Sequence, residues 1–281
     1  MTPLVFSHAN SYGAGTYAVL FEALRQRGLS AHAVNQFGHD PRYPVTSNWP
    51  HLVQQLIDFA TPLVKQYGAP IWLVGHSLGG YLSLMAASRA PELARGVLLL
   101  DSPLLGGWRA NALAVAKKTA LVGSMSPGAI SRRRRNQWPD QAAALAHFQS
   151  KKVFARWDPQ VLADYVANGT HDALADGETR RVLSFDRDVE TAIYNCLPHR
   201  LEAMLKRHPV KCPVSFIGGT HSAEIRQVGM DLTRRITHGR VMMLDGGHLF
   251  PMERPLVTAA AIETALLNLS TGCLSPDPVR E

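Results

Sequence analysis

Residues 71–89 place a predicted strand, a tight glycine turn and a predicted helix directly in line, in the sequence IWLVGHSLGGYLSLMAASR. The apolar run Ile71 to Val74 is typical of a buried strand, and Gly80 to Arg89 favours a helix. A turn this short requires small residues around it, because the two backbones approach each other closely. The segment therefore predicts the strand-turn-helix unit of a sheet that is covered by helices.

The same alternation of apolar runs and helical stretches recurs along the chain. The predicted strands are Leu4 to Phe6, Leu29 to Asn35, Ile71 to Val74, Gly96 to Leu100, Pro213 to Ile217 and Arg240 to Leu244. The predicted helices are Tyr17 to Arg27, Leu52 to Val64, Gly80 to Arg89 and Leu256 to Leu269. Strands that alternate with helices indicate a parallel sheet of the α/β class, and the wholly apolar fourth run predicts a strand buried on both faces.

Residues 104–207 interrupt this alternation. They are rich in Ala, Arg and Trp and carry no strong strand signal, so we predict a helical cap inserted into an α/β core of residues 1–103 and 208–281. The stretch from Pro103 to His208 has 16 Lys and Arg against 10 Asp and Glu, which is +6 of the total net charge of +7. Its arginine run, Arg132 to Arg135, is most simply a solvated helix end or loop. If the cap covers the site, this charge favours substrates with an anionic or polar acyl portion over those with long neutral chains.

Length and composition exclude several classes of protein. A chain of 281 residues that is 46% hydrophobic can bury one large core, so it is neither disordered nor fibrous. Its three cysteines, Cys196, Cys212 and Cys273, match no disulfide framework or metal spacing, and we expect no metal and no cofactor. Polar residues interrupt the charge-free stretch Gln66 to Ser88, so we expect no membrane span. The N-terminus resembles no export leader, which predicts a cytoplasmic protein.

The turn between the third strand and its helix carries the pattern Gly75-His76-Ser77-Leu78-Gly79, or G-x-S-x-G. This geometry pushes the serine Oγ out above the sheet edge, and the Leu78 N–H at the helix start can point at a developing oxyanion. A serine hydroxyl needs a base to remove its proton before it becomes a good nucleophile. His248 supplies one, because it follows Gly246 and Gly247 in the loop after the last predicted strand.

With this order of motifs the chain resembles the α/β-hydrolase superfamily from Leu4 to about Leu269, closest to its capped bacterial esterases and lipase-like hydrolases. The resemblance implies a mostly parallel central sheet with helices on both faces and an inserted helical cap, although the two leading antiparallel strands of the full fold are missing from the pattern. Ser7 to Asn10 is similar to the family's oxyanion loop, with Ala9 where glycine is usual. It implies the Asn10 N–H as the second oxyanion donor. We expect His76, Ala9 and Trp108 to contact the substrate.

The acid of the expected triad departs from the family pattern. The loop after Pro213 to Ile217, where the family usually carries it, holds no aspartate but does hold Glu224. A variation in the superfamily places the acid after the preceding strand, where Asp101 stands. A buried aspartate there needs a hydrogen-bonding partner, and His248 would be one. We therefore expect Asp101 as the acid, with Glu224 as the alternative.

These residues predict a serine hydrolase that cleaves a carboxylic ester or related acyl compound through an acyl-enzyme. Acyl transfer, thioester cleavage, carbon–carbon bond hydrolysis and perhydrolysis would use the same residues and stay open. A non-catalytic ligand-binding protein on this fold is a further alternative. A basic interaction protein that acts through the cap is another. The expected partner is a small acyl substrate, with no nucleic acid, and the sequence does not fix the oligomeric state.

Overall fold

A computed structural model of the chain describes residues 1–106, 131–175 and 177–271. Its centre is a six-stranded sheet with the spatial order β2-β1-β3-β4-β8-β9. Every neighbouring pair in this sheet is parallel. The strands are β1 (Thr2–Ser7), β2 (Leu29–Ala33), β3 (Ile71–His76), β4 (Ala94–Leu100), β8 (Val214–Gly219) and β9 (Val241–Leu244). All six predicted strands are present, and the α/β-hydrolase fold is confirmed.

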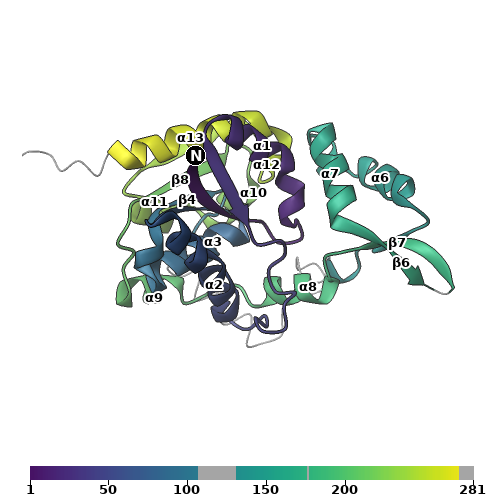
Figure 1. Cartoon of the computed structure of the whole chain (residues 1–281), viewed down its shortest axis with the longest axis horizontal. Coiled ribbons are helices and arrows are strands. Elements are labelled where there is room, and N and C mark those ends of the chain that lie inside the picture. The colour runs from purple at the N-terminus through teal and green to yellow at the C-terminus, as the bar shows by residue number, and fades with distance from the viewer. Residues whose placement is uncertain (107–130, 176, 272–281) are drawn as a thin grey trace, which may run out of the picture.

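Helices cover both faces of the sheet (Figure 1). One face packs against α1 (Ala18–Gln26) and α13 (Pro255–Thr271), and the other against α2 (Pro50–Tyr67) and α3 (Leu78–Arg89). Side chains of β4 alternate between the two layers: Leu98 and Leu100 join the first, and Val97 and Leu99 join the second. All four are fully buried, which explains the uninterrupted apolar run, since each such side chain contributes about 1.5–3 kcal/mol on burial.

Shorter helices complete the core. They are the 3-10 turns Ala14–Tyr17 and Pro91–Leu93, and the helices α10 (Ala223–Val228), α11 (Asp231–Thr237) and α12 (Phe250–Glu253). Within the described ranges, no helix is both long enough and apolar enough to cross a membrane.

The segment between β4 and β8 contains helices, as the sequence predicts, but also a small antiparallel sheet that it did not. The helices are α6 (Gln141–Gln149), α7 (Pro159–Gly169), α8 (Arg187–Asn195) and α9 (Leu201–Arg207), with a 3-10 turn at Lys152–Phe154. The strands β5 (Gln137–Trp138), β6 (Thr170–Ala175) and β7 (Glu178–Leu183) pair in the order β5-β7-β6. The strands are short and polar, so hydrophobic alternation could not reveal them, although an Asp-Gly pair at 176–177 is a hairpin signal.

The described residues 131–195 form a lobe beside the core, with α6, β6 and β7 on its outer side and α8 nearer the core (Figure 1), while α7 packs against the 3-10 turn Ala14–Tyr17 and α1 of the core. The lobe is fixed to the core through Trp157, whose ring lies 5.4 Å from that of Tyr12, and through an ion pair of 3.3 Å between Arg156 and Glu253. In contrast, α9 packs against α3 and contributes Leu201 and Leu205 to the core cluster. The division at residues 104 and 207 stays a prediction.

Candidate active site

The turn between β3 and α3 holds Ser77 in a strained backbone conformation, with φ 53° and ψ −114°. Residues other than glycine rarely adopt positive φ, and such strain costs about 1–3 kcal/mol. The flanking glycines have a steric reason. A Cβ on Gly79 would lie 1.9 Å from the Ser7 carbonyl oxygen, and one on Gly75 would lie 2.1 Å from the Gly79 oxygen. Only glycine at both positions lets the turn close tightly and leave the Ser77 side chain partly exposed.

His248 lies in the loop between β9 and α12 and connects Ser77 to Asp101. Its Nε2 is 3.0 Å from Ser77 Oγ, and its Nδ1 is 2.8 Å from Asp101 Oδ1. A neutral ring with its proton on Nδ1 donates to Asp101 and leaves Nε2 free to accept the serine proton. The structure therefore brings together the nucleophile, base and first-choice acid that the sequence predicted.

Asp101 ends strand β4 and is fully buried. Its Oδ2 accepts a hydrogen bond of 2.6 Å from the Gly219 N–H, and its Oδ1 accepts one of 2.6 Å from Ser222 Oγ besides that from His248. A buried carboxylate is tolerated only when such donors replace the lost hydration. Three donors on one side chain fix the direction of the carboxylate.

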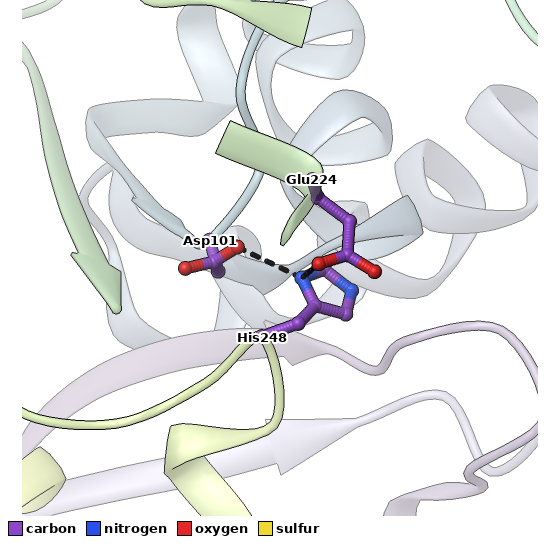
Figure 2. Close-up of side chains that lie close together, drawn as sticks. All are labelled: Asp101, Glu224 and His248. Carbon is purple, nitrogen blue, oxygen red and sulfur yellow. Dashed lines mark hydrogen bonds and ion pairs between the residues drawn. The ribbon is translucent and has the colours of Figure 1, made fainter. Parts of the chain in front are cut away.

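Glu224, the alternative acid, approaches the same nitrogen from another side (Figure 2). Its Oε2 lies 3.6 Å from His248 Nδ1, beyond hydrogen-bonding distance, and its side chain is 44% exposed. Burial alone would lower the pKa of His248, but the hydrogen bond to Asp101 and the charges of Glu224 and Asp101 outweigh burial and raise that pKa above its usual 6.5. Glu224 thus contributes charge, whereas Asp101 contributes both charge and orientation.

The ligand atoms of Asp101, Glu224 and His248 lie within 4.8 Å of one another, a spacing that a metal ion could bridge. The hydrogen-bond donors around Asp101 argue against that use. Both its oxygens already accept from Gly219, Ser222 and His248, and a metal would have to displace these bonds. The donor set fits a hydrogen-bonded acid-base chain better than a metal site.

His76, which we expected to contact substrate, is enclosed by the protein itself. Its side chain is fully buried, and both ring nitrogens are occupied within the protein. Tyr17 Oη lies 2.8 Å from Nδ1, and Nε2 lies 2.9 Å from the carbonyl oxygen of His248. Burial lowers the pKa of His76 to about 3, so the ring is neutral and donates from Nε2. Its role is to fix the loop that carries His248.

The loop after β1 has its own internal supports. The N–H of Ala9 donates to Tyr17 Oη at 3.0 Å, and the Ala9 carbonyl accepts from His8 Nδ1 at 2.8 Å. Both backbone polar groups of Ala9 are thus occupied within the protein and the residue is buried, so the expected contact of Ala9 with a substrate stays a prediction. Trp108 lies outside the described residues. The next N–H along the chain is that of Asn10, and no hydrogen bond to it or to the Leu78 N–H occurs among the residues that the structure describes.

Sequence reasoning missed the residues that hold the site in place. Tyr17 joins the Ala9 N–H to His76 and so links the oxyanion loop to the His248 loop. Ser222 caps helix α10 and at the same time donates to Asp101. The position of Ser222, in the loop where the family usually carries its acid, was the one available signal. For Tyr17 no sequence signal existed, because its partners are distant in the chain.

A buried polar cluster joins the loop after β1 to the lobe. Glu190 of α8, only 4% exposed, accepts from the Ser11 hydroxyl and pairs with Arg134 at 3.3 Å through both of its oxygens. The Glu190 carbonyl accepts from Asn10 Nδ2 at 3.1 Å, and Arg134 also donates to Tyr165 Oη. The residue expected to supply an oxyanion donor is therefore held by the lobe.

Comparison with known proteins points to one family. The rat monoglyceride lipase is 31% identical over 107 residues, which are 36% of this chain and 35% of that enzyme. A monoglyceride lipase homolog of monkeypox virus is 25% identical over 171 residues, or 57% of this chain and 61% of the viral protein. The alignments thus span about a third and about three fifths of these relatives.

Solved structures agree with the fold over nearly the full length. The crystal structure of E-2-(acetamidomethylene)succinate hydrolase aligns with a TM-score of 0.67 and 21% identity, covering 94% of this chain and 91% of that one. The thioesterase domain from the curacin biosynthetic pathway aligns with a TM-score of 0.68 and 19% identity, covering 93% and 90%. At these identities the likeness establishes the fold alone. The model of the alpha/beta hydrolase family matches residues 4–261, nearly the whole chain, and the protein therefore belongs to that family.

Proposed function

We propose that this protein is a serine hydrolase that cleaves a carboxylic ester or related acyl compound at Ser77. The observation that carries the proposal is the unbroken hydrogen-bond chain from Ser77 Oγ through His248 to Asp101, at 3.0 and 2.8 Å. Nucleophile, base and orienting acid in this geometry are what acyl transfer to a serine requires. The strained backbone of Ser77 and its hydrogen bond to His248 are explained by a catalytic role and not by a need of the fold.

In the first half-reaction Ser77 Oγ attacks the substrate carbonyl while His248 Nε2 takes the serine proton. The imidazolium that forms is stabilised by Asp101, whose own hydrogen bonds from Gly219 and Ser222 hold it in place. The oxyanion of the tetrahedral intermediate accepts hydrogen bonds from the Leu78 and Asn10 N–H groups. His248 then returns the proton to the leaving alcohol as the C–O bond breaks, which leaves an acyl ester on Ser77.

In the second half-reaction His248 Nε2 removes a proton from water, and the resulting hydroxide adds to the acyl carbon. The second intermediate expels Ser77, which regains its proton from His248, and releases the carboxylic acid. The net reaction consumes one ester and one water and needs no redox partner. The partial match to monoglyceride lipases supports an ester bond as the target. Acyl transfer, thioester cleavage, carbon–carbon bond hydrolysis and perhydrolysis remain compatible with the same steps.

A panel of p-nitrophenyl esters of increasing chain length, together with a monoglyceride, tests the proposal. Ser77→Ala should lower kcat by about 10⁴ to 10⁶ on every ester that the natural protein cleaves, because no other nucleophile stands in the turn. The control is Ser47→Ala, which removes an exposed serine on another loop. An alanine variant at position 77 that retains more than a tenth of the rate would overturn the assignment.

Covalent labelling separates catalysis from simple ligand binding. A fluorophosphonate should label the natural protein and Ser47→Ala equally, and should fail to label Ser77→Ala. If the natural protein is folded but neither labels nor turns over any ester, the site is a ligand pocket without turnover and the proposal fails.

A further inference from the structure

A cavity of about 790 Å³ lies between the loop after β1 and the lobe formed by α6 and α8. Ser11 and Tyr12 line it from the core, and Arg133, Arg135 and Lys151 line it from the lobe. This volume is within the range of small-molecule binding sites. For the run Arg132 to Arg135 the sequence most simply predicted a solvated helix end or loop. In the structure, these four arginines lie in different surroundings.

The four arginines of the run have separate roles. Arg134 turns inward and is neutralised by Glu190 at 3.3 Å. Arg132 faces a different hollow, which it shares with Asp186 and Asp188. Arg133 and Arg135 line the cavity described above. Only two of the four positive charges of the run therefore reach the cavity without an acidic neighbour of their own.

The cavity is left with a net positive charge. Among the described residues that line it, Glu190 is the single acidic one, and Arg134 already pairs with it. Arg133, Arg135 and Lys151 form no ion pair with any acidic residue that the structure describes, and the sequence from 107 to 130 contains no Asp or Glu. Arg135 donates a hydrogen bond of 2.9 Å from its Nε to the Gln137 carbonyl, and its guanidinium carbon lies 5.8 Å from the centre of the Trp138 ring.

The positive charges around the cavity also affect the pKa of a nearby histidine. His147 also lines the cavity, and its pKa is lowered, first by burial and then by the positive charges of Lys151, Arg135 and Arg134. Cations that act together on one ring must also act on a ligand in the same space. Such a field attracts an anion, and arginine forks match a carboxylate or a phosphate with two parallel hydrogen bonds.

Two residues that line the cavity are related to the proposed catalytic residues, one along the chain and one through its electrostatic surroundings. Ser11 directly follows Asn10, the proposed oxyanion donor. Tyr194 also lines the cavity, and its pKa is raised first by burial and further by negative charges that include Glu224. Glu224 Oε2 in turn lies 3.6 Å from His248 Nδ1. Ser77, Leu78 and His248 are not among the described residues that line the cavity, so a substrate whose ester lies at Ser77 would have to extend past Ser11 or Tyr194 to reach the cations.

We propose that this cavity binds an anionic group, a carboxylate or a phosphate, on the substrate whose ester is cleaved at Ser77. The inference rests on the proposed hydrolase function and narrows its substrate class. It distinguishes this protein from a lipase that selects long neutral acyl chains. In this proposal, the guanidinium groups of Arg133 and Arg135 and the ammonium group of Lys151 donate hydrogen bonds to the bound anionic group.

Two p-nitrophenyl esters that differ only in charge test the inference: the monoester of adipic acid, and the same compound with its free carboxylate methylated. We expect the natural protein to have a kcat/KM about tenfold higher for the carboxylate than for the methyl ester at low salt, because three cations attract it. The advantage should fall as salt is added. Ser77→Ala gives the spontaneous rate to subtract.

The triple variant Arg133→Gln, Arg135→Gln, Lys151→Gln should lose that preference, so that the ratio of kcat/KM for the carboxylate to kcat/KM for the methyl ester falls to about one. All three side chains belong to exposed residues, so the fold should survive. The matched control is Arg132→Gln, which removes a charge from the same run outside the cavity and should keep the preference. Equal preference in the natural protein and the triple variant would overturn the inference.

Inhibition by small anions identifies the group that is bound. Hexanoate and hexyl phosphate should inhibit hydrolysis of the methyl ester competitively and more strongly than hexanol, and the stronger of the two identifies a carboxylate or a phosphate. Inhibition by hexanol as strong as by both anions would contradict an anion site.

The two proposals can fail separately. If both esters are cleaved at similar rates, the hydrolase stands and the anion site falls. If neither is cleaved and the fluorophosphonate does not label Ser77, the hydrolase falls. Calorimetry with Ser77→Ala then decides the cavity alone, because hexanoate or hexyl phosphate should bind this variant and not its combination with the triple substitution.

Discussion

Replacing Asp101 by asparagine tests whether Asp101, and not Glu224, orients the His248 ring. The new side chain has nearly the same shape but one acceptor oxygen and one NH₂ group. One of its two positions must face the Gly219 N–H, and the other must face His248 Nδ1 and Ser222 Oγ. The backbone N–H of Gly219 can only donate, whereas the serine hydroxyl can rotate and the imidazole can change tautomer.

The amide oxygen should therefore stay on Gly219, which turns the NH₂ group toward His248. The ring then accepts on Nδ1 and carries its proton on Nε2, where it points at Ser77 and cannot take the serine proton. We expect kcat to fall by about 10³ to 10⁴, which corresponds to about 4–5.5 kcal/mol in activation free energy. KM should change little, because Asp101 is buried away from the substrate.

The assay is steady-state hydrolysis of one p-nitrophenyl ester by three variants. Glu224→Gln should cost less than about tenfold, because its partly exposed carboxylate acts across 3.6 Å without a hydrogen bond to the ring. Asp245→Asn is the control, since its carboxylate bonds His221 and Arg254 instead. A large loss at Glu224 with near-normal activity in Asp101→Asn would show that the orientation argument is wrong. Similar modest losses at both would indicate a Ser77 and His248 dyad.

Three further predictions concern the surroundings of the site. Glu224→Gln removes a charge that raises the pKa of His248, and because the neutral ring is the base, the acidic limb of kcat/KM should move to lower pH; an unmoved limb in a pH-rate profile would contradict this. Tyr17→Phe leaves two buried partners without a hydrogen bond and should lower the free energy of unfolding in urea by about 1–3 kcal/mol, with kcat falling more than KM changes. Glu190→Ala leaves Arg134 unpaired and should cost about 3 kcal/mol by the same measurement, whereas a loss below about 1 kcal/mol would mean that the pair does not fix the lobe.

Local sequence patterns were enough to predict the strands and main helices of the α/β core. A βα turn needs glycine where backbones touch, and a strand covered on both faces must be apolar throughout, so the turn around Ser77 and strand β4 could be recognised from composition and spacing alone. The order of strands then placed Ser77, Asp101 and His248 at the same edge of one parallel sheet. The short strands β5, β6 and β7 escaped notice because their polar residues carry no period-two pattern.

Tertiary structure supplied the contacts that distinguish residues between which the sequence indicated only a preference. Asp101 and Glu224 both reach His248, and only the positions of the Gly219 N–H and the Ser222 hydroxyl show which carboxylate is fixed. In the same way, only the structure shows that His76 is buried and hydrogen-bonded to Tyr17 and to the His248 backbone, where the sequence suggested a substrate contact. Likewise, only the structure shows that Arg134 pairs with Glu190, unlike the arginines beside it. A residue's type sets which bonds it can form, but which bonds form depends on partners that are distant in the chain and meet only in the folded protein.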